Sequence, residues 1–195
     1  KYEARIKKLN LTEEAKERIN EEMDKIIVVS EHSRDVFKNT MYQGQHPETN
    51  LVTSLSTNTP ISVVNYPVKN PGKKTIKLDL HYKFNYLAVA QWGPRKNVPN
   101  LIQWFVEENF DQEVGLVLKL SIKNGCITDR VHTEKAITQI LEKHQDRKCK
   151  VYLLHGDLTE AEMTGLYQYS KIKCLVTTTH GEGFGLPLFE AAYNG

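Results

Sequence analysis

From residue 84 onward the chain alternates short, almost wholly apolar runs with amphipathic segments of about a dozen residues. The apolar runs are FNYLAVAQ at 84–91, GLVLKL at 115–120, KVYLLHG at 150–156 and KCLVTTT at 173–179. Strands of this kind are typical of parallel sheets, because helices cover both faces of such a sheet. The sequence therefore predicts an α/β domain with a doubly wound, Rossmann-like parallel sheet.

The segments between these runs carry helix signals. Apolar residues fall at helical spacing after Pro99 and again over residues 133–144. Thr159 and Glu162 have the spacing of a capping box, which marks the start of a third helix. Pro187 suits the first turn of a fourth helix.

Residues 1–83 are more polar and give weaker signals. We divide the chain into residues 1–67, with short strands, and residues 68–195, which hold the parallel sheet. The elements expected before residue 84 are a helix at 3–24, a strand at 26–30, a helix at 33–39 with Val36 and Phe37 facing inward, a loop at 41–58, a strand from 61 to 67 and an edge strand at 76–82.

Composition narrows the function classes. The formal net charge of +2 argues against a nucleic-acid binder, and no apolar run reaches the roughly 20 residues that span a bilayer. The N-terminal residues are too charged for a signal peptide, and the sequence has three cysteines without CxxC spacing. We expect a cytoplasmic protein with reduced thiols and no metal site, and peripheral attachment to the inner membrane face stays open.

Two loops follow strands of the predicted sheet at the edge where such sheets bind ligands. They are QWGPRKN at 91–97 and THGEGFGLP at 179–187. Glycines at 181, 183 and 185 allow a ligand to approach the backbone, and the helix that follows directs its positive end toward an anion. The spacing matches neither a dinucleotide fingerprint nor a P-loop. A glycine-rich turn without a ligand stays an alternative.

The segment HGEGFGLPLFEAAYNG resembles the signature of the family-4 (group 1) retaining glycosyltransferases of GT-B fold. In that family the segment reads EGFGLPxxEAMAxG, and Glu182 and Glu190 match its two glutamates. GPRKNVPNLIQWF resembles the phosphate loop of the same family, although Ala90 and Gln91 stand where the family often has Gly-Arg. The resemblance covers residues 84–195 well and residues 24–67 loosely.

The resemblance implies a catalytic role for three charged residues. Glu182 would hold hydroxyls of the donor sugar near its anomeric carbon. Lys96 and Arg95 would neutralise the diphosphate that leaves, which is electrostatic catalysis. A solvated pair of cations is the alternative for these two. No metal and no other cofactor is implied, because the helix end and the basic side chains take that role.

The remaining implied residues bind the donor. Glu190 would bind the ribose hydroxyls, and a surface position on the helix is the alternative. The backbone around Gly183, Phe184, Gly185 and Leu186 would meet the sugar and the diphosphate, and that of Gly156, Asp157 and Leu158 would face the nucleobase. His180 precedes the signature and is expected beside the donor, with simple packing as the alternative.

We therefore expect the donor-binding half of a hexosyltransferase-type glycosyltransferase, joined to a remnant of the acceptor-side domain at residues 1–67. The implied reaction moves a sugar from a nucleotide-diphosphate donor to a hydroxyl of an unidentified glycan, lipid or other acceptor, with retention. A non-catalytic sugar-nucleotide-binding module and a related sugar-nucleotide epimerase are the alternatives. The missing initiator Met and the end at Gly195 predict a piece of a longer protein, inactive alone, with a homodimer as one way to cover exposed surface.

Overall fold

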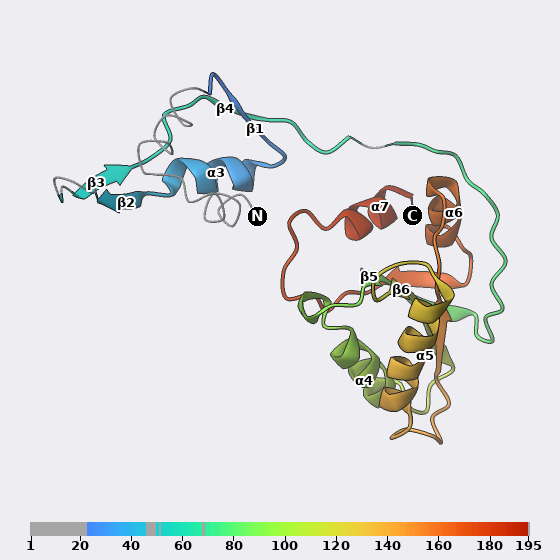
Figure 1. The fold of residues 1–195 in the computed structure, drawn as a ribbon. Coiled ribbons are helices and arrows are strands. Elements are labelled where there is room, and N and C mark those ends of the chain that lie inside the picture. Colours follow the sequence, from blue (N-terminus) through green and yellow to red (C-terminus); the bar gives the residue numbers. More distant parts are fainter. Residues whose placement is uncertain (1–22, 46–49, 51, 68, 195) are drawn as a thin grey trace. The chain divides into compact units, whose positions relative to one another are not determined.

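The computed structural model describes residues 23–45, 50, 52–67 and 69–194. The chain divides into two compact units, Lys1–Val68 and Lys69–Gly195. The helix expected at residues 3–24 lies almost wholly outside the described residues. Figure 1 shows the order of the elements in each unit.

The first unit contains a small parallel pairing. Strand β1 (Ile26–Val28) pairs with β4 (Ile61–Val63), with Ile26 opposite Ile61. Helix α3 (Glu31–Asn39) follows β1, and Ser30 caps it by accepting a hydrogen bond from the backbone amide of Ser33. The two strands and the helix are predicted at these places, but β4 ends at Val63 and not at residue 67, and α3 starts at Glu31 and not at residue 33.

Two expectations for the first unit are wrong. Residues 41–58 are not only loop, because β2 (Tyr42–Gln45) and β3 (Val52–Leu55) form an antiparallel pair. The polar sequence of β2 hides this pairing, since backbone groups alone can make the ladder. Val36 and Phe37 do not face inward, as they are 49% and 43% exposed.

The second unit holds a four-stranded sheet in which every pairing is parallel, in the order β7-β6-β5-β8. Its strands are β5 (Phe84–Gln91), β6 (Val114–Ser121), β7 (Lys150–Leu154) and β8 (Ile172–Leu175). The central strands β5 and β6 are rich in buried residues, as their apolar sequences predict. The predicted α/β fold with a Rossmann-like parallel sheet is confirmed.

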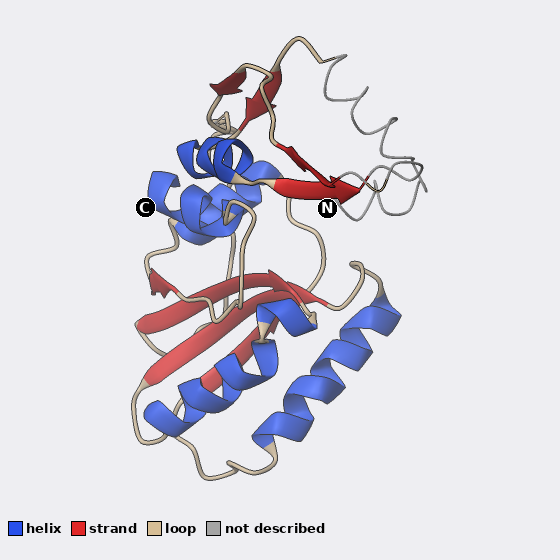
Figure 2. Ribbon diagram, turned by 90° about the vertical axis from the view of Figure 1, so that its left-hand side faces the viewer, coloured by secondary structure: helices blue, strands red, loops and turns tan. Residues whose placement is uncertain are grey.

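Helices cover both faces of this sheet. Helices α4 (Val98–Glu108) and α5 (Ile127–Leu141) lie on one face, and α6 (Glu160–Tyr167) and α7 (Leu186–Asn194) lie on the other (Figures 1 and 2). The first face is filled by Ile102, Phe105, Leu116 and Leu118, among others. The second is filled by Leu87, Val117, Leu166 and Tyr167.

Helix starts follow the predicted signals with one exception. Thr159 and Glu162 form the predicted capping box at the start of α6. Helix α5, however, begins at Ile127, ahead of the predicted start at residue 133. Its cap is Cys126, whose sulfur accepts from the backbone amide of Asp129, and a cysteine is a weak sequence signal for a cap.

The edge strand expected at residues 76–82 does not form. Ile76, Leu78 and Leu80 still pack against the α6 side of the sheet, which explains their alternating pattern. The carbonyls of Leu78 and Leu80 are bonded by side chains in place of a neighbouring strand. Tyr169 Oη donates to the carbonyl of Leu78 at 3.0 Å, and Lys171 Nζ donates to that of Leu80 at 2.6 Å.

Candidate functional site

The candidate site lies at the edge where the four parallel strands of the second unit end. Because all four strands run in the same direction, the loops after β5, β6, β7 and β8 meet at this edge. Both loops singled out in the sequence are among them. The fold therefore brings residues 92–97 next to residues 176–185, although these segments are far apart in the chain.

Three charged side chains from the two loops form one cluster. Lys96 Nζ donates to one carboxylate oxygen of Glu182, and Arg95 Nη1 lies 3.0 Å from the other. The same Arg95 nitrogen donates to the carbonyl of Gly181. The side chains of Lys96 and Glu182 are 14% and 22% exposed, whereas that of Arg95 is 57% exposed. Lys96 and Glu182 are thus shielded from water far more than an ordinary surface ion pair.

The cluster sets the charge state of its carboxylate. The hydrogen bond from Lys96, together with that from Arg95 and against the effect of burial, holds the pKa of Glu182 below its usual value. The carboxylate is therefore charged at neutral pH, where it can accept hydrogen bonds from neighbouring hydroxyls as well as from the two cations.

Backbone contacts fix the two loops to each other. The amide of His180 donates to the carbonyl of Arg95 at 2.9 Å, and Thr179 Oγ1 donates to the same oxygen at 3.1 Å. Thr178 Oγ1 donates to the carbonyl of Asn97 at 3.2 Å. His180 thus contributes through its backbone, and the cluster is held by bonds that do not involve its charged atoms.

Gly185 ends the second loop and starts α7. Its φ of +79° is left-handed, a conformation that glycine adopts without strain. Its carbonyl accepts hydrogen bonds from the amides of Leu188 and Phe189, which makes it the N-cap of the helix. Phe184 packs edge-to-face on Phe189. The positive end of α7 therefore lies beside Glu182 and its cations.

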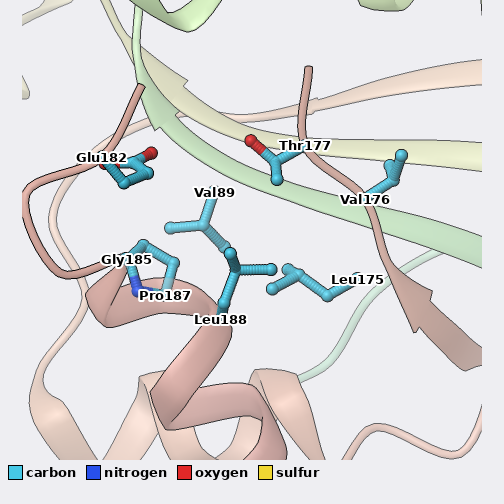
Figure 3. A pocket seen from close by; sticks show the side chains of 8 residues that line it. All are labelled: Val89, Leu175, Val176, Thr177, Glu182, Gly185, Pro187 and Leu188. Atoms are coloured by element: carbon cyan, nitrogen blue, oxygen red, sulfur yellow. The ribbon is translucent and has the colours of Figure 1, made fainter. Parts of the chain in front are cut away.

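A shallow depression lies below Glu182. It is lined by Val89, Leu175, Val176, Thr177, Glu182, Gly185, Pro187 and Leu188. In Figure 3 the polar groups of Glu182 and Thr177 lie on one side of Val89, and Leu188 lies on the other. Its cavity volume of about 10 Å³ holds one water molecule, so this depression is too small to enclose a ligand.

Glu190 lies on α7 and faces α6. One of its carboxylate oxygens accepts a hydrogen bond of 3.0 Å from Tyr167 Oη. Burial and the adjacent carboxylate raise the pKa of Tyr167, so the phenol keeps its proton and donates. Tyr167 occupies one acceptor position of Glu190, and an ionised carboxylate has further lone pairs for a ligand.

The loop after β7 turns sharply at Gly156, where φ is +97°. Lys119 Nζ, from the neighbouring strand β6, donates to the Gly156 carbonyl at 2.6 Å. Asp157 is exposed, and Leu158 packs against the α6 side of the core. Residues 156–158 thus lie at the same edge as the Lys96 cluster.

A buried pair fixes two of the edge loops. His155 Nε2 donates to Asp129 Oδ1 at 2.7 Å, and their side chains are 3% and 5% exposed. Asp129 also accepts from the backbone amides of Ile122, Lys123 and Asn124. Burial alone would raise the pKa of Asp129, but these hydrogen bonds outweigh burial and lower it. The pair therefore joins residues 122–124 to the end of β7.

Reasoning from sequence missed Lys119 and Asp129. Lys119 has a visible signal, because it is a charged residue inside the apolar run VLKLS. Asp129 has none, since the groups that donate to its carboxylate, His155 and the amides of residues 122–124, are not linked to it by any local pattern. In the described part of the chain, no group of three or more His, Cys, Asp or Glu residues could hold a metal ion. No helix within the described ranges has the length and apolar character to cross a bilayer.

Known structures share this fold. Similar ones include an apo structure of OtsA (TM-score 0.57, 12% identity, covering 88% of this chain and 43% of that one). Another is titled as trehalose-6-phosphate from E. coli bound with UDP-2-fluoro glucose (TM-score 0.52, 14% identity, 88% and 43%). A third is TarM (TM-score 0.52, 17% identity, 93% and 30%).

These neighbours are GT-B glycosyltransferases. At such identities the likeness shows the fold, and this chain spans less than half the length of each neighbour. No protein-family model matches the sequence, and no curated protein matches it closely. The expected Rossmann-like fold of GT-B type is thereby confirmed, whereas assignment to family 4 stays a prediction.

Proposed function

We propose that this chain binds the nucleotide-sugar donor of a glycosyltransferase that moves a hexosyl group to an acceptor hydroxyl. The observation that carries the proposal is the cluster of Lys96, Arg95 and Glu182 beside the N-terminus of α7. Two cations and a helix dipole at one point suit a diphosphate, and a carboxylate beside them suits sugar hydroxyls. The similarity in fold to sugar transferases agrees with this assignment.

The proposed chemistry is departure of the nucleoside diphosphate, with retention of configuration. Negative charge develops on the diphosphate as the bond to the anomeric carbon breaks. Lys96, Arg95 and the positive end of α7 stabilise that charge, so no metal ion is required. Glu182 orients the donor sugar through its hydroxyls, and Glu190 accepts hydrogen bonds from the ribose.

The backbone at residues 156–158 faces the nucleobase in this proposal. The turn at Gly156 is fixed by the hydrogen bond from Lys119 to the Gly156 carbonyl and, through the preceding residue, by the His155–Asp129 pair. A rigid turn presents backbone groups at fixed positions, which is what recognition of a planar base requires. The acceptor is a glycan, a lipid or another hydroxyl compound.

A thermal-shift panel tests this proposal. The purified chain is heated with UDP-, GDP- and ADP-sugars, with the free sugars and with the nucleosides, all in EDTA. A ligand that binds only the native state raises the Tm. We expect one base series to raise the Tm in EDTA, and the free sugar to have no effect. If no nucleotide sugar shifts the Tm, or if the shift requires Mg²⁺ or Mn²⁺, the proposal is wrong.

A turnover assay tests for sugar transfer and for epimerisation by this chain. The donor selected by the panel is labelled in its sugar and incubated with candidate acceptor hydroxyls. Labelled glycoside of unchanged anomeric configuration supports the transferase. An epimerised sugar nucleotide would identify an epimerase. Binding without turnover agrees both with a binding module and with the expectation that this chain alone is inactive.

A further inference from the structure

Lys119 is a half-buried lysine at the edge of the sheet that the cluster of Lys96, Arg95 and Glu182 does not include. It lies two residues before the end of β6. In the register of the sheet it stands between Val89 of β5 and Leu154 of β7. Both neighbours pack on the α6 side of the core, so Lys119 points to that same face.

This position links the two halves of the candidate site. Val89 lines the depression below Glu182, and Leu154 leads directly into residues 156–158. Adjacent strands lie about 4.8 Å apart, so the backbone of Lys119 is one strand away from each. An ammonium group here lies between the expected positions of the diphosphate and of the nucleobase.

The charge of Lys119 is incompletely compensated. Its Nζ donates to the Gly156 carbonyl at 2.6 Å, and an ammonium has three donors. No carboxylate among the described residues forms an ion pair with it. The nearby Asp157 instead lies against Gly125, where an added Cβ would come within 2.9 Å of Asp157 Oδ2. Two donors and a full charge are thus available at a position shielded from water.

The surroundings of Lys119 change its pKa. Burial lowers the pKa of Lys119, and the charge of Asp157 opposes the shift. A half-buried cation with this environment gains more from an anionic partner than an exposed lysine would, because water competes less for it.

We propose that Lys119 is a further donor-binding residue, whose ammonium rests on the Gly156 carbonyl and binds an anionic oxygen of the donor diphosphate. This inference rests on the proposed function. An anion is favoured over a neutral base carbonyl because the charge of Lys119 is incompletely compensated, and the diphosphate is the anionic part of the donor.

Four variants test the inference. Lys119→Met removes the charge and the donors while keeping an unbranched side chain of nearly the same length. Lys119→Gln removes the charge but keeps a donor for the Gly156 carbonyl. Lys119→Arg keeps the charge. Lys150→Met is the matched control, because Lys150 is an exposed lysine at the opposite end of β7.

Calorimetry then compares the nucleoside, its monophosphate and its diphosphate, for the base that the panel selects. From the usual strength of hydrogen bonds to charged groups, we expect Lys119→Met and Lys119→Gln to lower the affinity for the nucleoside diphosphate about tenfold or more. The affinity for the nucleoside should change by less than about twofold in these two variants. Lys119→Arg should retain most of the affinity for the diphosphate, and Lys150→Met should bind both ligands as wild type does.

Each other outcome overturns a defined claim. Unchanged diphosphate affinity in Lys119→Gln removes Lys119 from the donor site. Equal loss of nucleoside and diphosphate means that Lys119 only supports the turn at Gly156. If the wild-type chain binds no nucleoside diphosphate at all, the proposed function fails and this inference fails with it.

Discussion

Lys96 and Glu182 are joined by a hydrogen bond that spans 86 positions of the sequence. Arg95 lies 3.0 Å from the second oxygen of the same carboxylate. Without a ligand, both cations therefore share one acidic side chain, and the cluster keeps a formal net charge of +1. A diphosphate that enters this site must share the cations with Glu182, which gives Glu182 an energetic role in addition to its proposed contact with sugar hydroxyls.

This sharing predicts that Glu182→Gln binds nucleoside diphosphate more tightly than wild type. An exposed ion pair contributes up to about 1 kcal/mol, and the pair of Lys96 with Glu182 is better shielded than that, so we expect an increase on the order of tenfold. The extra affinity that the sugar moiety adds should shrink at the same time. Calorimetry with the diphosphate and with the matching nucleotide sugar measures both. Weaker diphosphate binding by Glu182→Gln would show that the carboxylate does not compete for the cations.

The contact between Tyr167 and Glu190 predicts unequal effects of two substitutions. Glu190→Ala should weaken nucleotide binding by roughly 1.5–3 kcal/mol, because it removes hydrogen bonds from ribose hydroxyls to a charged acceptor. Tyr167→Phe removes only the hydroxyl that donates to Glu190 at 3.0 Å, so its effect should be smaller. Titrations with the ribonucleoside and with its 2′,3′-dideoxy analogue check this. Glu190→Ala should bind the ribonucleoside and the dideoxy analogue with equal affinity. If Glu190→Ala still prefers the ribonucleoside, the ribose hydroxyls bind elsewhere.

The lowered pKa of Glu182 predicts how stability depends on pH. A carboxyl group whose pKa is lower in the folded state stabilises the fold above its unfolded value, near 4.5, and that contribution is lost as the pH falls through the folded value. Wild type should therefore have a higher Tm than Glu182→Gln at pH 7. The difference should shrink as the pH falls below about 4.5.

Glu113 provides a control for this measurement. It also has a lowered pKa, from its hydrogen bond to Lys148, but its side chain is 67% exposed. Water and salt screen such a pair, so Glu113→Gln should change the Tm little at any pH. An equally large effect for Glu113→Gln would mean that net charge, and not the Lys96 cluster, causes the pH dependence.

Sequence patterns predicted the sheet because its central strands, β5 and β6, are buried on both faces. Runs such as residues 84–91 and 115–120 are apolar on both faces of the strand, as is typical of a parallel sheet that helices cover on both sides. The pattern at residues 76–82 misled for an instructive reason. It alternates because one face packs on the core, but its carbonyls are bonded by Tyr169 and Lys171 and not by a strand. Alternation reports burial of one face and not the identity of the backbone partner.

The candidate site was predictable where it depends on the topology. Loops after parallel strands meet at one edge, so the proximity of Lys96 to Glu182 follows from the strand assignments. The contact between Tyr167 and Glu190 depends on how α6 packs against α7, which no local pattern encodes. The bond between Lys119 and Gly156 likewise depends on strand register and on the turn after β7.

The capping box of α6 predicts a measurable loss of stability. Thr159 Oγ1 accepts from the amide of Glu162, and the Glu162 carboxylate accepts from the amide of Thr159 at 2.9 Å. Thr159→Ala should lower the free energy of unfolding by about 1 kcal/mol. Thr138→Ala is the control, because Thr138 Oγ1 only donates to the carbonyl of Glu134 inside α5. Chemical denaturation of both variants checks this, and equal losses would contradict the capping role.

The central claim is that Lys96, together with Arg95 and the N-terminus of α7, binds the diphosphate of a sugar-nucleotide donor. Titration calorimetry in EDTA tests it most directly, with the nucleoside and the nucleoside diphosphate of the selected base added to wild type, Lys96→Ala and Lys173→Ala. Lys173 is an exposed lysine near the start of β8 and serves as the control. We predict that Lys96→Ala lowers the affinity for the nucleoside diphosphate about tenfold or more and leaves the affinity for the nucleoside unchanged. Lys173→Ala should bind both ligands as wild type does. Diphosphate binding by Lys96→Ala at wild-type affinity would contradict the claim.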